Sequence, residues 1–141
     1  MKRKRRTNIL VDGDPALRRQ LADEIRRSHT VVELSPSQSG LVMLTARESA
    51  RRSLFHLGEV LTTGCRVQIG DAVGLGIIAG DDAQAAQDLA VIDAAYRAEL
   101  AECERWDSAL EAEEQRLIAA RAADEARLLE TRVRFESMDA D

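Results

Sequence analysis

The sequence predicts an α+β fold, in which an antiparallel β-sheet of about five short strands, within residues 30–79, packs with an N-terminal helix and two long C-terminal helices. The centre of the chain contains short runs of alternating apolar and polar residues that end at glycines or polar turns, which is typical of β-strands. On both sides of this centre, apolar residues recur every three or four positions, which indicates helices.

The length and composition predict an independently folding chain. It has 141 residues, the usual length of one domain and enough to bury a core without metals or disulfides. We therefore expect a single domain over residues 1–141, with a basic and mobile N-terminus at residues 1–13. No apolar run reaches the roughly 20 residues of a membrane span, and no signal peptide is expected. We expect Cys65 and Cys103 to be buried free thiols of a cytoplasmic protein.

Charge is distributed unevenly along the chain. Residues 1–30 carry a net charge of +5, residues 31–80 carry none, and residues 81–141 carry −10. The acidic C-terminal half argues against nucleic-acid binding, which requires a continuous basic surface. Aromatic residues make up only 3% of the chain, so the stacking platforms that bind single-stranded nucleic acid are also missing.

The first helix is expected to begin at Asp14-Pro15, because Asp caps free N–H groups and Pro suits the first turn of a helix. Leu17, Leu21 and Ile25 then recur every four residues and form one apolar stripe on a charged helix. Residues 2–12 are basic and then briefly apolar, which indicates only a short, frayed helix.

Five runs in the centre of the chain are expected to be strands. Their bounds are Thr30–Leu34, Leu41–Arg47, Ser53–Leu57, Val60–Ile69 and Val73–Ala79. Ser35–Gly40 is expected to be a turn, and Gly70-Asp71 a tight hairpin. The second run, LVMLTAR, is mostly apolar, which predicts a strand that is covered on both faces.

Glycines mark the end of the predicted sheet. Gly74 and Gly76 leave one face of the last strand without side chains, and such a face allows another backbone or a ligand to come close. Gly80, Asp81 and Asp82 then end the sheet and open a helix, and either Asp is suited to cap its first turn.

The two C-terminal helices differ in character. The helix that starts near Ala85 is apolar around most of its circumference as far as Tyr96, so we expect it to be buried on more than one side. Residues 108–130 favour a helix but carry only a sparse apolar stripe, so we expect this helix to lie on another protein chain. On this interpretation, Leu117→Glu breaks subunit assembly and leaves the isolated domain folded.

Three polar residues are candidates for catalysis. Asp93 lies in the apolar helix, where it is either a general base or ligand-binding carboxylate, or a structural group paired with Arg or backbone N–H groups. His56 and Glu59 lie in the motif FHLGEV, where acid–base chemistry is conceivable because His titrates near neutral pH. A half-exposed position on an alternating strand is the simpler interpretation of His56. A stand-alone enzyme would place these three residues in a pocket against the face of Gly74 and Gly76.

Other kinds of site receive little support. The spacing Gly74-x-Gly76-x-x-x-Gly80 is one residue longer than a dinucleotide-binding fingerprint, and no βαβ pattern surrounds it. No Cys/His cluster has metal-ligand spacing, so we expect no metal site. Gly58, in the motif FHLGEV, is interpreted as a backbone requirement for a turn or for close approach by a partner.

The order and spacing of the motifs resemble the PhnG family, the small subunit of the bacterial carbon–phosphorus lyase core complex. The resemblance covers residues 15–138. It is carried by GLVMLTAR (40–47), FHLGEVLTT (55–63), CRVQIGDAVGLG (65–76), AGDD (79–82), AVIDAA (90–95) and TRVRFESM (131–138). The motif residues singled out are Phe55, Gly58, Glu59, Gly74, Gly76, Gly80, Asp82 and Asp93.

The resemblance implies an accessory subunit, needed with a PhnI-type subunit to transfer a phosphonate onto the ribose C1 of ATP with release of adenine. It also implies PhnH-, PhnI- and PhnJ-type partners, subunits present in pairs, a cytoplasmic location and no cofactor in this subunit, because the radical iron–sulfur step belongs to PhnJ. Two alternatives remain. One is a stand-alone nucleotide-binding enzyme with an acid/base pair at Glu59 and Asp93, and the other is a homo-oligomeric binding module.

Overall fold

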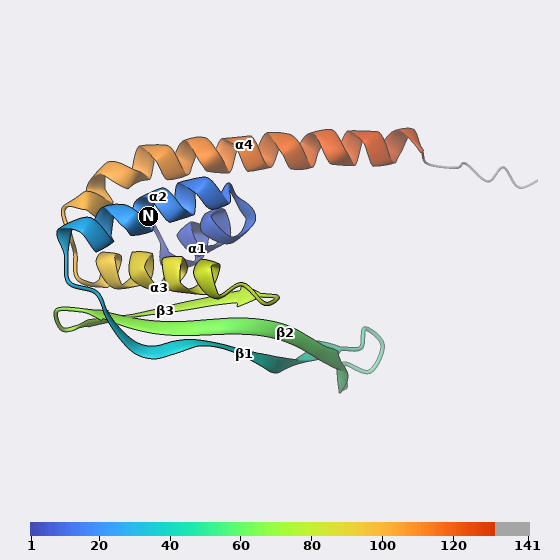
Figure 1. Cartoon of the computed structure of the whole chain (residues 1–141). Coiled ribbons are helices and arrows are strands. Elements are labelled where there is room, and N and C mark those ends of the chain that lie inside the picture. The colour runs from blue at the N-terminus through green and yellow to red at the C-terminus, as the bar shows by residue number, and fades with distance from the viewer. Residues whose placement is uncertain (132–141) are drawn as a thin grey trace, which may run out of the picture.

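Helices cover one face of a three-stranded antiparallel sheet (Figure 1). In the computed structural model, which describes residues 1–131, helix α3 (Ala83–Arg97) lies directly on the sheet. Helices α1 (Arg3–Asp12) and α2 (Pro15–Ser28) lie over α3, and α4 (Glu102–Glu130) forms the outermost layer. The α+β class predicted from the sequence is confirmed.

The N-terminal helices form as a pair around a tight turn. Asp14 caps α2, where its carboxylate accepts the N–H of Ala16 at 2.8 Å, and Pro15 occupies the first turn. The helix predicted from Asp14-Pro15 is therefore present. Residues 3–12 form α1, which buries Ile9 and Leu10 in the core.

Within residues 30–79 the sheet has three strands, so the predicted number of five was wrong. Strand β1 (Val32–Arg47) pairs with β2 (Leu54–Ile69), which pairs with β3 (Ala72–Ala79). The polar run Ser35–Gly40 does not reverse the chain, because register shifts opposite Arg66 and Gly64 absorb its extra residues.

The predicted strands Ser53–Leu57 and Val60–Ile69 also form one continuous strand, for a similar reason. Gly58 has a φ of +149°, and the register slips by one residue next to it, between Leu44 and Thr45. Two predicted strands consequently join into β2 through a bulge. The hairpin at Gly70-Asp71 is present as expected, and Gly70 adopts a left-handed φ of +57° in it.

Helix α3 covers the side of β3 that carries no side chains. A Cβ atom at Gly76 would lie 2.6 Å from the backbone N of Ala90, and one at Gly74 would lie 2.7 Å from the Cβ of Ala94. The bare strand face is thus filled by the backbone and alanines of α3. Asp82 caps this helix through the N–H of Ala85 at 2.9 Å.

The core lies between the sheet and the outer helices. Ile25 of α2 and Ile92 of α3 are fully buried there, together with Leu110 of α4. Trp106 of α4 packs edge-on against Tyr96, with ring centroids 5.8 Å apart. From residue 118 to residue 131 every residue of α4 and its C-terminal end is exposed within the described chain. Arg121 still pairs with Asp12 of α1 at 2.7 Å, and beyond it α4 extends past α1 and α2 (Figure 1). The motif 131–138, apart from its first residue, lies outside the described residues.

A substitution that adds one methyl group to β3 tests the close contact between α3 and β3. We expect Gly76→Ala to lower the free energy of unfolding by about 1–3 kcal/mol, because the added Cβ overlaps the α3 backbone, which has no room to move. Urea unfolding measures this change. Gly40→Ala is the matched control, because its Cβ meets no atom within 4 Å, and its effect should stay within about 0.5 kcal/mol. Equal midpoints for the two variants would contradict the close packing.

Candidate functional site

Asp93 joins three elements of the fold. Its carboxylate accepts the backbone N–H of Leu75 at 3.2 Å, and therefore satisfies one donor of the edge strand β3. Arg3 donates to both carboxylate oxygens at 2.8 and 2.9 Å, and Arg6 donates to Oδ1 at 3.1 Å. Arg97, one turn later on α3, lies 3.4 Å away. This geometry favours the structural interpretation of Asp93, because every oxygen is already engaged.

The surroundings of Arg6 explain why this carboxylate is needed. The Arg6 side chain is only 6% exposed, and its guanidinium lies 3.8 Å above the ring centre of Tyr96. Burial lowers the pKa of Arg6, while the nearby Asp93 raises it. Burial also raises the pKa of Tyr96 to about 12 and that of the Cys103 thiol to about 11. Asp93 therefore supplies the counter-charge for a buried cation beside two groups that resist ionisation.

The other two catalytic candidates lie elsewhere. Leu75, which Asp93 contacts, stands opposite Arg66 on β2, and Glu59 is seven residues farther along that strand. At about 3.3 Å per residue, roughly 23 Å of strand separates Glu59 from Asp93. His56 lies farther still, opposite Thr45. The structure therefore does not bring Asp93 together with Glu59 and His56.

The glycines of the dinucleotide-like spacing do not form a phosphate cradle. Gly74 and Gly76 are covered by α3, as described above. Gly80 has a φ of +94°, and its carbonyl accepts the Thr63 hydroxyl at 2.7 Å. This turn aims Asp82 at the N-terminus of α3, where the carboxylate caps the helix.

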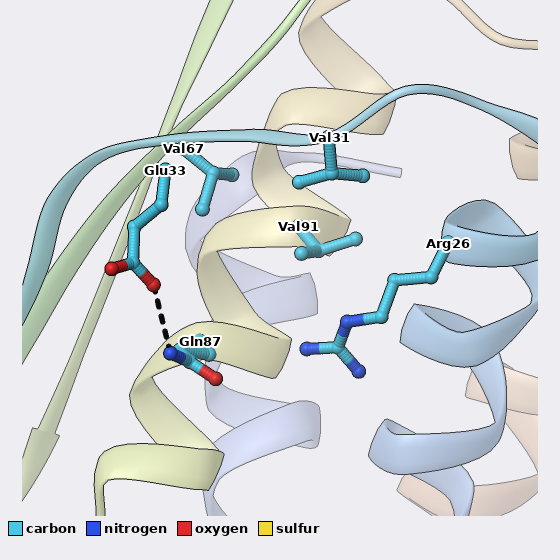
Figure 2. A pocket seen from close by; sticks show the side chains of 6 residues that line it. All are labelled: Arg26, Val31, Glu33, Val67, Gln87 and Val91. Carbon is cyan, nitrogen blue, oxygen red and sulfur yellow. Dashed lines mark hydrogen bonds between the residues drawn. The ribbon is translucent and has the colours of Figure 1, made fainter.

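A cavity of about 270 Å³ opens between α2, α3 and the start of β1 (Figure 2). Arg26 reaches into it, but its guanidinium is paired with Asp88 at 2.7 Å and with Asp23 at 2.8 Å. On the opposite wall, Gln87 donates to Glu33 at 2.9 Å. The polar side chains that line this cavity are therefore already paired, and its volume is below the ~300 Å³ of a typical ligand pocket.

The paired ends of β1 and β2 carry many exposed apolar residues, which the sequence did not predict. Strand β3 ends at Ala79, opposite Thr62, so β1 and β2 continue as a two-stranded hairpin that projects past β3 and α3 (Figure 1). We call residues 41–61 the β-arm. Its exposed large apolar residues are Leu41, Val42, Met43, Leu44, Leu54, Phe55, Leu57 and Leu61.

The β-arm contains residues that the sequence analysis placed elsewhere or assigned to other roles. Phe55, Gly58, His56 and Glu59 all lie on it. Leu41–Arg47 was predicted to be covered on both faces, and this prediction was wrong for the described chain, which leaves both faces of the run open. The reason is that α3 and β3 are too short to reach this end of the sheet.

Residues 1–131 also lack a metal site and a membrane-spanning helix. No group of three His, Cys, Asp or Glu side chains in that range is arranged to hold a metal ion. Within the same residues, no helix is long and apolar enough to cross a membrane.

Comparison with known families decides the family. A family model described as phosphonate metabolism protein PhnG matches residues 1–139. The chain belongs to the PhnG family. PhnG membership gives it a role in phosphonate metabolism. No curated protein matches the chain in a sequence comparison.

The role of Asp93 in this PhnG-family chain is open to a direct test. We expect Asp93→Asn to lower the free energy of unfolding by about 3–5 kcal/mol, because the buried Arg6 loses its counter-charge. Arg3→Ala is the control, since the Arg3 side chain is about half exposed and its loss should cost less than about 1 kcal/mol. A fully stable Asp93→Asn protein that had lost a nucleotide-dependent activity would instead favour the acid/base interpretation.

Stability should fall in alkaline solution. Cys103 has a pKa of about 11 in the fold and 9.0 when unperturbed, so above pH 9 the unfolded chain releases this proton while the folded chain keeps it. The folded state then binds more protons, and its stability decreases as pH rises from about 9 to 11. We expect the urea midpoint to fall between pH 8 and pH 10, and to fall less in Cys103→Ala. An identical decline in both proteins would contradict this origin.

Proposed function

We propose that this PhnG-family chain is an accessory subunit of the carbon–phosphorus lyase core complex and acts beside a PhnI-type subunit. In the reaction, a phosphonate oxygen bonds to the ribose C1 of ATP, the bond from C1 to the purine nitrogen breaks, and adenine leaves with a proton. The product is a ribose 1-phosphonate 5-triphosphate. The proposal includes PhnH- and PhnJ-type partners, subunits present in pairs, and a cytoplasmic location.

The exposed β-arm is the observation that carries this proposal. Large apolar surfaces left open on a folded protein mark sites of association, and the β-arm exposes eight large apolar side chains. The candidate catalytic residues, by contrast, are dispersed. Asp93 is neutralised by arginines, and Glu59 lies roughly 23 Å away on the β-arm. This distribution supports a subunit that contributes surface to a complex.

Helix α4 offers a second, smaller surface. Leu128 and Leu129 are exposed on its projecting part, and Ile118 is exposed where α4 still lies beside α1, which agrees with the sparse stripe that the sequence indicated. Leu117 is half-buried beside Ile9 and Arg5 of α1, so Leu117→Glu would also disturb the packing of α1 on α4. Leu128→Glu, at a position 71% exposed, is the cleaner test of this helix.

The proposed role predicts a dependence between two proteins. Given ATP and methylphosphonate, we expect a purified PhnI-type subunit to release adenine and form the ribose 1-phosphonate 5-triphosphate only when this chain is present. The reason is that the accessory subunit completes the assembly in which the phosphonate is transferred. Chromatography of adenine and ³¹P NMR of the product measure the two halves of the reaction.

Each component alone provides the control for this assay. Equal product from the PhnI-type subunit without this chain would contradict the accessory role. Consumption of ATP by this chain alone, abolished in a folded Asp93→Asn variant, would instead establish an enzyme in its own right.

A further inference from the structure

The two faces of the β-arm are both apolar and both open. Leu41 and Met43, on the face that α3 covers elsewhere in the sheet, are 63% and 54% exposed. Val42 and Leu44, on the opposite face, are 50% and 45% exposed. A two-stranded ribbon is marginally stable in water by itself, and apolar side chains on both sides add to the cost of exposure. The β-arm therefore requires cover on two sides.

The described part of the chain supplies no such cover. Strand β3 ends opposite Thr62, and all the described helices lie on one side of the sheet, away from the arm's outer face (Figure 1). The pattern LVMLTAR is typical of a strand buried on both faces. The residues of the arm are thus typical of a buried strand, whereas the described chain leaves them exposed. A partner that covers both faces of the arm would bury these residues.

The charge at the tip indicates what kind of partner this is. We call residues 47–53 the tip of the β-arm, and they carry three arginines (Arg47, Arg51 and Arg52) against a single acidic residue, Glu48. Among the ion pairs of residues 1–131, none involves Arg51 or Arg52. A surface with carboxylates at the end of the arm would complement this charge.

A second copy of the chain fits these features poorly. A two-fold contact between tips would bring the arginines of one arm against those of the other, which is repulsive. A reciprocal contact, with each tip on the acidic α4 of the other copy, would close as a dimer. However, α4 exposes only Ile118, Leu128 and Leu129 as large apolar side chains, and a single helix covers one face of the arm and leaves the other open. The apolar character of both faces, together with the charge at the tip, therefore favours a different polypeptide.

We propose that the β-arm inserts into a groove on a different protein chain, apolar along both walls and acidic where the tip lies. This inference rests on the proposed function, since it names the surface through which the subunit joins its complex. The arm is then the main attachment, and the projecting half of α4 is secondary to it.

The test uses the full chain and a tagged PhnI-type subunit as the probe. Met43→Glu and Leu44→Glu place one charge on each face of the arm, and we expect each to weaken binding about tenfold or more. Val32→Glu is the matched control on the same strand, 51% exposed, and should change the Kd by less than about twofold. Thermal unfolding of each isolated variant checks that the fold is intact.

A charge change at the tip of the β-arm tests whether the groove is acidic where the tip lies. Arg51→Glu should slow association several-fold at low salt, and the difference should shrink as salt is added, because the contact is electrostatic. Arg51→Lys keeps the charge and should leave the association rate close to that of the unaltered chain. No difference between the two variants would overturn the acidic end of the groove.

The remaining outcomes separate this inference from the proposed function. Failure of the unaltered chain to bind the PhnI-type subunit would overturn the proposed function and this inference with it. If the unaltered chain binds, loss of binding on one face only would place the arm flat on a surface and overturn the groove. Unchanged binding in both Met43→Glu and Leu44→Glu would overturn the β-arm as the attachment surface. Conversion of a self-associated chain to monomers by these substitutions would show that the arm binds a second copy and would overturn the different partner.

Discussion

The close approach of α3 to β3 is the contact on which the rest of this fold depends. Gly74 and Gly76 allow the helix backbone to reach the strand backbone without intervening side chains. Because the two backbones lie so close together, the carboxylate of Asp93 on α3 accepts a hydrogen bond from the N–H of Leu75 on β3, at 3.2 Å. The same carboxylate then binds Arg3 and Arg6 of α1. The glycine contact between β3 and α3 thereby also positions α1, which lies on the far side of α3 from the sheet.

The same arrangement concentrates exposed apolar surface at one end of the molecule. Helix α3 and strand β3 stop well before the β1–β2 hairpin does, so the core ends and the hairpin continues. The four helices of residues 1–131 lie on one side of the sheet. Over the same residues the outer face, including Leu75 and Ile77, has no cover (Figure 1). A protein built in this way has a stable part, which holds the fold, and an extended part, which is available to a partner.

Much of the fold follows from local chemistry that the sequence displays. The caps at Asp14 and Asp82, the hairpin at Gly70-Asp71, and the apolar stripe of Leu21 and Ile25 all predict elements that the structure contains. The number of strands was not predictable in this way. Ser35–Gly40 and Gly58 look like breaks in a local pattern, but pairing with a neighbouring strand absorbs them as register shifts and a bulge.

By itself the sequence determined the fold class, the starts of α2 and α3, and the family resemblance, because these depend on periodicity, capping residues and motif order along the chain. The start of α4 was not determined, because this helix has no side-chain cap and begins at Glu102, before the predicted range of residues 108–130. It left Asp93, Glu59 and His56 as one possible site, since spacing does not show distance in space. Only the tertiary structure decided that Asp93 pairs with Arg6 while Glu59 lies far along the strand. It also decided that Leu41–Leu44 are exposed, because burial depends on which elements reach a surface and not on the residues that form it.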